Sequence, residues 1–156
     1  MEESKQDKMI SIKIIEKEDS HKDLQLEIGE FKQIADSYYF FLDDTTETTY
    51  NETTLRILIE KLIKSWKESL SKLQTGDKTY IPFDFSDQYI GCIQCILAPT
   101  DRLLIRYGVT TKFTGSGINP SQMHLFSLNE SDFTAITETF HYSLSDLLQY
   151  PILSIA

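Results

Sequence analysis

Two cysteines three residues apart are the clearest candidates for chemistry in this sequence. Cys92 and Cys95 form a Cys-x-x-Cys pattern, which in redox proteins places the first thiol at a helix N-terminus, where its pKa is lowered. Here the pair lies in the apolar run from Tyr89 to Leu97, which is typical of a strand. Residues three apart in a strand point to opposite faces and lie about 10 Å apart, too far for a disulfide. We therefore predict buried, unreactive thiols.

Other groupings that would hold a metal or a phosphate are weaker. His21, His124 and His141 are far apart in the sequence, and none has the spacing of a metalloprotease motif. The glycine-rich stretch 115–117 precedes no P-loop lysine and no clear helix start, so it predicts a flexible loop. We expect no catalytic residue, no cofactor and no metal.

Two aspartates flank the expected end of a hairpin. Asp84 and Asp87 lie on either side of Phe85 and Ser86, and paired carboxylates can act in acid–base catalysis or hold calcium. The sequence lacks the Asp-x-Asp-x-Asp-Gly pattern of a calcium loop, and aspartates in turns are usually structural. We predict a turn role for both, with contact to a partner as the alternative.

An acidic and aromatic run is more informative about partners. Five acids and no base occur from Asp36 to Glu52, and tyrosines lie beside them. Tyrosines surrounded by acids suit a basic protein surface, although the aromatics could instead be core and the acids a solvated loop. The residues predicted to contact a partner are Tyr38, Tyr39, Asp43, Asp44, Glu47, Asp84 and Asp87.

The net charge of −9 is concentrated in one part of the chain. From Asp23 to Glu60 there are nine acids against Lys32 and Arg56, a balance of −7. A field of this sign repels phosphate backbones and anionic lipid, so we expect neither a nucleic-acid nor a membrane partner. It suits a basic protein. The alternative is that the charge only keeps the protein soluble.

The clearest predicted element is a helix from about Glu52 to Leu73. Its apolar residues recur at steps of three and four and form one continuous stripe: Leu55, Ile59, Leu62, Trp66, Leu70 and Leu73. Acid-before-base pairs four residues apart, Glu60/Lys64 and Glu68/Lys72, indicate a solvated opposite face.

Strands are predicted on both sides of this helix. Alternating or aromatic patterns indicate strands over residues 9–15, 24–28, 38–42, 79–85 and 103–109. The run 89–97 is nearly all apolar and predicts a central strand covered on both faces. Pro82 places its strand at an edge or a strand start. Residues 133–142 fit either a helix or a strand, and we favour an extended segment followed by a short helix over Leu144–Tyr150, capped by Ser143. The order predicts an α+β fold. In it an antiparallel sheet of about five to seven strands carries the long helix on one face, with a short C-terminal helix.

Composition predicts one ordinary domain. The chain has 156 residues, 40% of them hydrophobic, which suffices for a packed core without disulfides. Residues 1–8 are a charged tail without the apolar stretch of a signal peptide, and the uncharged run from Gln88 to Thr100 is too short to span a bilayer. We expect a cytoplasmic protein with a disordered tail over 1–8 and a single domain over 9–156.

A resemblance to a known class adds a functional expectation. The segment Ile-Pro-Phe-Asp-Phe-Ser-Asp-Gln-Tyr-Ile-Gly at 81–91, the strand at 102–111 and the loop at 115–121 resemble small acidic immunity proteins of bacterial polymorphic-toxin and contact-dependent inhibition systems. The resemblance implies a non-enzymatic protein that binds and blocks a cognate toxin. Two alternatives stay open: a small thiol redox enzyme using Cys92 and Cys95, and a small-ligand carrier with a cavity between helix and sheet.

Overall fold

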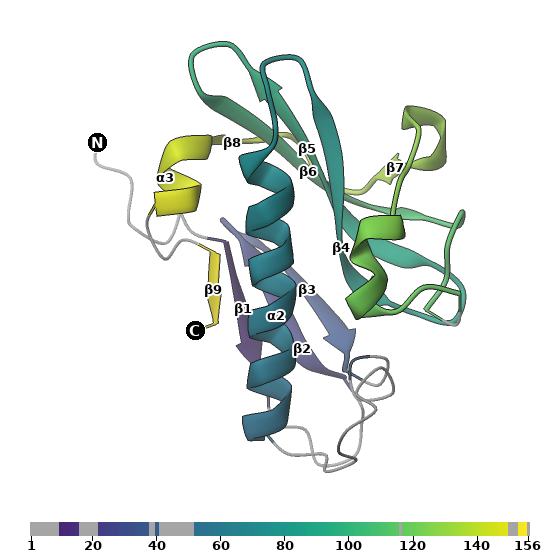
Figure 1. Cartoon of the computed structure of the whole chain (residues 1–156). Coiled ribbons are helices and arrows are strands. Elements are labelled where there is room, and N and C mark those ends of the chain that lie inside the picture. Colours follow the sequence, from purple (N-terminus) through teal and green to yellow (C-terminus); the bar gives the residue numbers. More distant parts are fainter. Residues whose placement is uncertain are drawn as a thin grey trace.

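The computed structural model describes residues 10–15, 22–37, 40, 52–115, 117–149 and 153–155. In this part of the chain, two β-sheets and one long helix contribute to a common hydrophobic core (Figure 1). The fold is α+β, as predicted, and its strands are divided between two sheets where we expected one.

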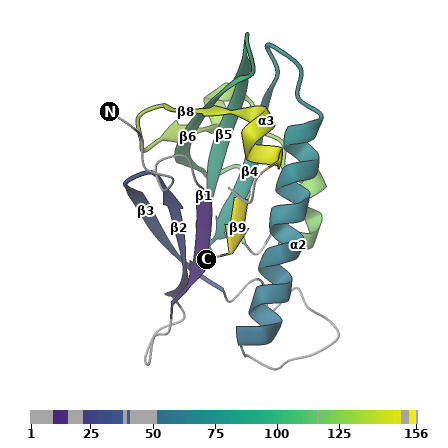
Figure 2. The same ribbon diagram turned by 90° about the vertical axis from the view of Figure 1, so that its left-hand side faces the viewer.

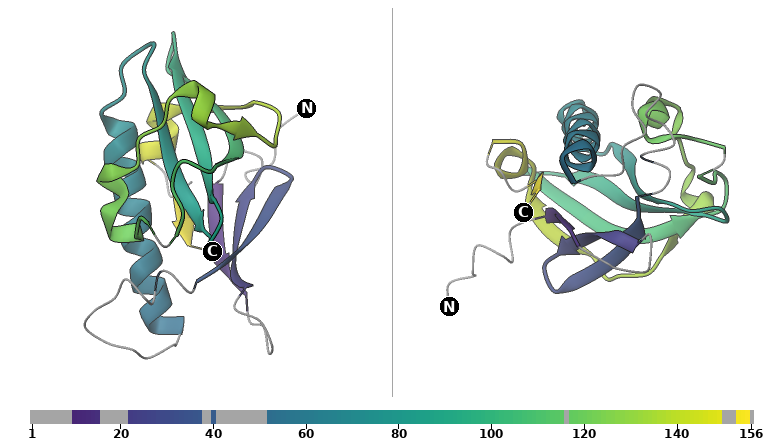
Figure 3. Two further views of the ribbon diagram at one scale, coloured as in Figure 1. Left: turned by 90° about the vertical axis from the view of Figure 1, so that its right-hand side faces the viewer. Right: turned by 90° about the horizontal axis from the view of Figure 1, so that it is seen from below.

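The first sheet has the strand order β3-β2-β1-β9. Its strands are β1 (Ile10–Ile14), β2 (Lys22–Ile28), β3 (Phe31–Asp36) and β9 (Leu153–Ile155). The first three pair antiparallel, whereas β9 is parallel to β1. The predicted alternation is confirmed on β1 and β2, because their isoleucines and leucines on one face are buried, apart from Ile14, which is partly buried. The β2–β3 hairpin lies at the margin of the molecule (Figure 3).

The second sheet has the order β4-β5-β6, with two short strands on the far side of β6. Its strands are β4 (Lys78–Phe85), β5 (Ile90–Ala98), β6 (Arg102–Thr110), β7 (Thr134–Ala135) and β8 (Phe140–Ser143). As predicted, β5 is central and mostly buried, and β4, which contains Pro82, is an edge strand. Short 3-10 helices at Pro120–Leu125 and Glu130–Asp132 connect β6 to β7.

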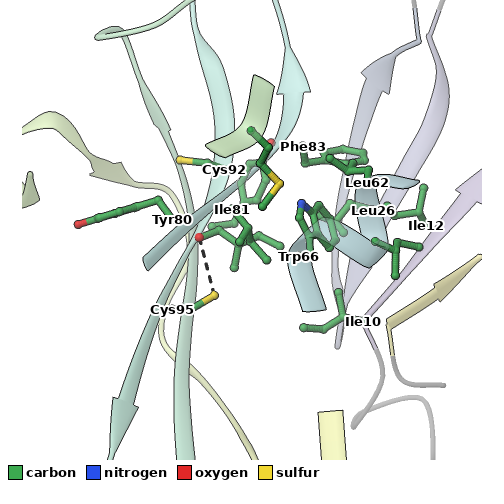
Figure 4. Packing of buried hydrophobic residues seen from close by; sticks show 14 of the residues in the cluster. Ile10, Ile12, Leu26, Leu62, Trp66, Tyr80, Ile81, Phe83, Cys92 and Cys95 are labelled. Atoms are coloured by element: carbon green, nitrogen blue, oxygen red, sulfur yellow. Dashed lines mark hydrogen bonds between the residues drawn. The ribbon is translucent and has the colours of Figure 1, made fainter. Parts of the chain in front are cut away.

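Helix α2 (Glu52–Ser71) confirms the predicted apolar stripe. It packs beside both β9 and β4 (Figure 2). Trp66 is fully buried, and its indole N–H donates a 2.9 Å hydrogen bond to the carbonyl of Pro82. Figure 4 shows this indole between residues of the first sheet, such as Ile12, and residues of β4, such as Ile81. Through Trp66, the apolar stripe of α2 therefore contacts both sheets.

The C-terminal helix is α3 (Leu144–Gln149). Ser143 caps it as predicted, because its Oγ accepts a 3.2 Å hydrogen bond from the Asp146 N–H. Asp101, in the β5–β6 turn, adds a second cap, since its carboxylate accepts hydrogen bonds from the Ser143 hydroxyl (2.6 Å) and the Ser145 N–H (3.2 Å). Asp101 has a positive φ of 63°, a conformation that aspartate tolerates better than most residues.

The strand predicted over 38–42 is not formed at Phe40, the one residue of that run that the structure describes. Phe40 is helical, and its N–H bonds to the carbonyl of Ser37 at 2.9 Å. Two strands were also missed, β3 and β9. In β3 the core-facing positions include the polar Gln33, which weakens the alternation, and β9 is only three residues long.

Candidate functional site

The residues predicted to bind a partner fall into two groups. Five lie outside the residues that the structure describes: Tyr38, Tyr39, Asp43, Asp44 and Glu47. Asp84 and Asp87 belong to the hairpin formed by β4 and β5. We call residues 84–91, with the side chains that contact them, the β4–β5 end. It is the part of the candidate site that the structure describes.

Asp84 is buried, with 5% of its surface exposed. A register shift between Pro82 and Asp84 makes Phe83 an extra residue in β4, so that Asp84 stands opposite Gly91. Bulges of this kind re-aim the side chains near them. The hydroxyl of Tyr89 donates to the Asp84 carboxylate over 3.3 Å. Asp84 therefore lies inside β4 and not in the turn predicted for it.

Asp87 is exposed near the tip of the hairpin, in the turn predicted for it. Two other segments meet the hairpin here. The Gly115 N–H donates a 2.6 Å hydrogen bond to the Ser86 carbonyl. The ring of Phe40 packs edge-on against Phe85, with 5.5 Å between centroids. The loop after β6 and the start of the acidic run therefore lie at this end of the hairpin together with Asp87.

Tyr107 of β6 completes the polar cluster at this end. Its hydroxyl lies over Gly91, where an added Cβ would collide with it and would stand 2.9 Å from the Cβ of Asp84. The hydroxyl is buried and has no hydrogen-bond partner among the described residues. Gly91 is therefore required by a close approach between neighbouring strands, as is common for glycines inside strands.

Burial determines the chemistry of these tyrosines. It raises the pKa of Tyr107 well above its ordinary value, and the charge of Asp84 raises it further. Burial also raises the pKa of Tyr89, with Asp84 again adding to the effect. Both hydroxyls are thus protonated donors at neutral pH. The cluster can hold the hairpin in shape, but neither hydroxyl is activated as a nucleophile.

The cysteines are buried, as predicted (Figure 4). Burial raises the pKa of the Cys92 thiol to about 12, and it raises that of Cys95 as well, with Cys92 as a second cause. The Cys95 thiol lies 3.8 Å from the Ile93 carbonyl. A redox cysteine needs a lowered pKa and access to solvent, so this pair has the opposite properties.

Two of the three histidines lie in the part of the chain that the structure describes. His124 and His141 are exposed, and His21 falls outside the described residues. Within the described ranges, no three histidine, cysteine or acidic side chains are grouped as metal ligands would be. The helices in this part of the chain include none with the length and apolar character to cross a membrane.

Comparison with protein-family models, curated proteins and solved structures found no match. The candidate site is therefore defined by its geometry alone. Of its members, Tyr89, Gly91 and Tyr107 were not identified as site residues from the sequence. A glycine within a strongly apolar strand was the one signal for a close approach, but it did not indicate which side chain approaches.

Proposed function

We propose that this chain is a non-enzymatic protein-binding module, an immunity protein that binds and neutralises a cognate bacterial toxin. The observation that carries the proposal is the position of the base-free acidic segment. It begins at Asp36, the last residue of β3, and ends at Glu52, the first residue of α2. Both of its ends therefore belong to elements of the described fold.

The start of this segment is anchored at the β4–β5 end. Ser37 and Phe40 are both buried, and Phe40 packs on Phe85. In Figure 1, β3 ends and α2 begins in the lower half of the molecule, where the β4–β5 hairpin also turns. The acidic segment thus begins and ends in described elements on the side that presents Asp87. A concentration of negative charge on one side favours a basic partner.

The alternative functions have less support from the packing. A thiol redox enzyme would need a reactive cysteine, whereas Cys92 and Cys95 are buried with raised pKa values. A carrier would need a cavity between helix and sheets, whereas Trp66 occupies that position and is hydrogen-bonded to Pro82. A binding surface requires neither feature.

The direct test uses the protein encoded next to this one. The C-terminal domain of a secreted protein in the adjacent upstream reading frame would be purified and its binding to this chain measured kinetically. Growth of cells expressing that domain would be compared with and without this chain. We expect nanomolar-class binding, as is usual for stable complexes, and restored growth. Absence of both binding and protection would reject the proposal.

A further inference from the structure

Strand β3 is an edge strand among the described strands of the first sheet. It pairs with β2, and no other described strand pairs with it. Figures 2 and 3 show it at the margin of the molecule. Unpaired edge strands present a row of N–H and C=O groups that can pair with another strand. The question is which strand this edge would accept.

The turn between β2 and β3 determines which backbone groups face outward. Ile28 and Phe31 stand opposite each other across the two-residue turn Gly29-Glu30, in which Gly29 has a φ of 56°. Such a closing pair exchanges its hydrogen bonds within the hairpin, and hydrogen-bonded and open pairs then alternate. The N–H and C=O groups of Lys32 and Ile34 therefore point away from β2. The outward Ile34 carbonyl accepts a solvent-exposed 3.2 Å hydrogen bond from the Gln33 side-chain amide.

The side chains along this edge form a short self-complementary pattern. Lys32, Ile34 and Asp36 alternate along β3 and therefore share one face of the sheet. The Lys32 side chain is 62% exposed, and Ile34 is one of the few large apolar residues that are exposed, at 37%. Lys32 and Asp36 thus lie two residues before and two residues after the exposed Ile34.

We propose that β3 pairs antiparallel with β3 of a second copy of this chain, about a two-fold axis at Ile34. In this register Ile34 faces Ile34 of the second copy, and Lys32 of each chain faces Asp36 of the other. The outward backbone groups of Ile34 then bond to each other across the axis. Such an interface has the same patch on both subunits, as a two-fold dimer requires.

The charges select this register over its competitors. A two-fold axis at Lys32 would place two lysines opposite each other, and an axis at Asp36 would oppose two aspartates. Like charges directly opposite destabilise a strand pair, and opposite charges stabilise it. Lysines on edge strands discourage pairing with arbitrary strands. Lys32 is nevertheless compatible with pairing to a second β3, because it faces Asp36 there.

The dimer is expected to be weak. Six residues of edge strand bury less surface than a standard protein interface, and each subunit carries a net charge of −9. We expect a dissociation constant on the order of 0.1 mM at a salt concentration of about 0.15 M, where screening reduces the repulsion between subunits. The dimer does not depend on the function proposed above.

The test is sedimentation velocity over a range of concentrations with charge-reversed variants. Lys32→Asp and Asp36→Lys each place like charges at both ends of the paired strands, so each should weaken the dimer about tenfold or more. The double variant restores opposite charges and should return close to the wild-type value. Lys61→Asp and Glu60→Lys, on the exposed face of α2, make the same changes in net charge and should have little effect.

A wild-type chain that remains monomeric up to about 1 mM, ten times the expected constant, would overturn the proposal. So would a dimer indifferent to the single reversals, or a double variant as weak as the single ones. Circular dichroism would confirm that each variant is folded.

Amide hydrogen exchange on the wild-type chain gives a test without substitutions. Raising the protein concentration should slow exchange at Lys32 and Ile34, whose N–H groups face outward, and leave Gln33, bonded to β2, unchanged. Protection of Lys32 and Ile34 already present in dilute, monomeric protein would mean that another part of the chain covers the edge. Dimerisation without new protection would place the interface elsewhere. Either result would reject the proposed pairing.

Discussion

At the scale of single residues, the β4–β5 end depends on a contact that only glycine permits. The Tyr107 hydroxyl occupies the space that a side chain at position 91 would need. The same hydroxyl has no hydrogen-bond partner among the described residues. A buried polar group without a partner contributes a desolvation cost and no compensating bond. Gly91 and the Tyr107 hydroxyl therefore form one coupled pair.

Gly91→Ala should lower the free energy of unfolding by about 1–3 kcal/mol, the usual effect of overpacking. Tyr107→Phe alone should be neutral or stabilising, because it removes an unpartnered hydroxyl. In the double variant the phenylalanine should recover part of the loss, which urea denaturation would measure as a coupling energy. Gly117→Ala is the control, since a Cβ there has no neighbour closer than 3.7 Å. An equal loss at both glycines would contradict the collision.

The cysteines give a second prediction at this scale. Because burial raises the pKa of Cys92 to about 12, its thiol should remain protonated at pH 8 and react with iodoacetamide only through unfolding. Both thiols should therefore be labelled slowly in buffer and rapidly in denaturant, as mass spectrometry would show. Fast labelling of either cysteine in the native protein would instead favour the redox alternative.

At the scale of elements, α2 is held by an apolar stripe that contains Trp66. This side chain combines full burial with a hydrogen bond to Pro82. Proline has no N–H, so its carbonyl is the only backbone group that it can offer for a hydrogen bond. The edge strand β4 is bonded to the helix through this carbonyl. Helix α3 is held differently, through the caps that Ser143 and Asp101 provide.

Trp66→Ala should cost about 3–5 kcal/mol of unfolding free energy, because it leaves a large cavity among both sheets and α2. Trp66→Phe should cost less, since it keeps much of the apolar volume and loses the hydrogen bond to Pro82. Tryptophan fluorescence of the wild-type chain should be blue-shifted and resistant to acrylamide. Strong quenching in the native state would show that the residue is not in the core.

Asp101 predicts a pH dependence for the α3 cap. Hydrogen bonds from Ser143 and Ser145 lower the pKa of Asp101 below its ordinary value of 3.8. A depressed pKa contributes stability at neutral pH that is lost as the pH falls below that value. Asp101→Asn tolerates the positive φ and removes the charge. Its cost should be under about 1 kcal/mol at pH 7, because the site is exposed, and should shrink toward zero in acid. A cost that persists well below pH 3.8, where the carboxylate is protonated, would show that the charge is not responsible.

At the scale of the whole molecule, ion pairs neutralise part of the acidic excess between Asp23 and Glu60. Glu27, one of the nine acids between Asp23 and Glu60, lies 3.2 Å from Lys13 and 3.8 Å from Lys32. Its charge is therefore balanced on the outer face of the first sheet. The remaining excess belongs mostly to the base-free run from Asp36 to Glu52, whose start lies at the β4–β5 end.

Association with a basic partner should be electrostatically steered. It should exceed the roughly 10⁵–10⁶ M⁻¹s⁻¹ of neutral surfaces and fall steeply as salt rises through about 0.15 M. The triple variant Asp43→Asn, Asp44→Asn, Glu47→Gln should slow association without unfolding the protein. Replacing Tyr38 or Tyr39 by alanine should instead speed dissociation.

The matched control removes the same charge from exposed positions elsewhere, Glu60→Gln, Glu68→Gln and Glu138→Gln. It should slow association less than the triple variant in the acidic run. Equal effects would mean that only the total charge matters, and a rate that does not change with salt would mean that the charge serves solubility.

Local pattern was sufficient for much of this fold. The three-and-four spacing of apolar residues determined α2, alternation determined β1, β2, β4 and β6, a continuous apolar run determined β5, and Ser143 was identifiable as a helix cap. These features depend on neighbours within a few residues, so they can be recognised along the chain. Burial of Cys92 and Cys95 followed in the same way, because their strand is apolar on both faces.

Tertiary structure decided what depends on distant partners. Strand β9 is defined by pairing with β1, from the other end of the chain, and β3 is defined by a hairpin whose core face is partly polar. Asp84 is buried because an extra residue, Phe83, shifts the register of β4. Gly91 is needed because Tyr107 approaches it from a neighbouring strand. Side-chain direction in a sheet reverses with each residue of register, and register is a property of strand pairs.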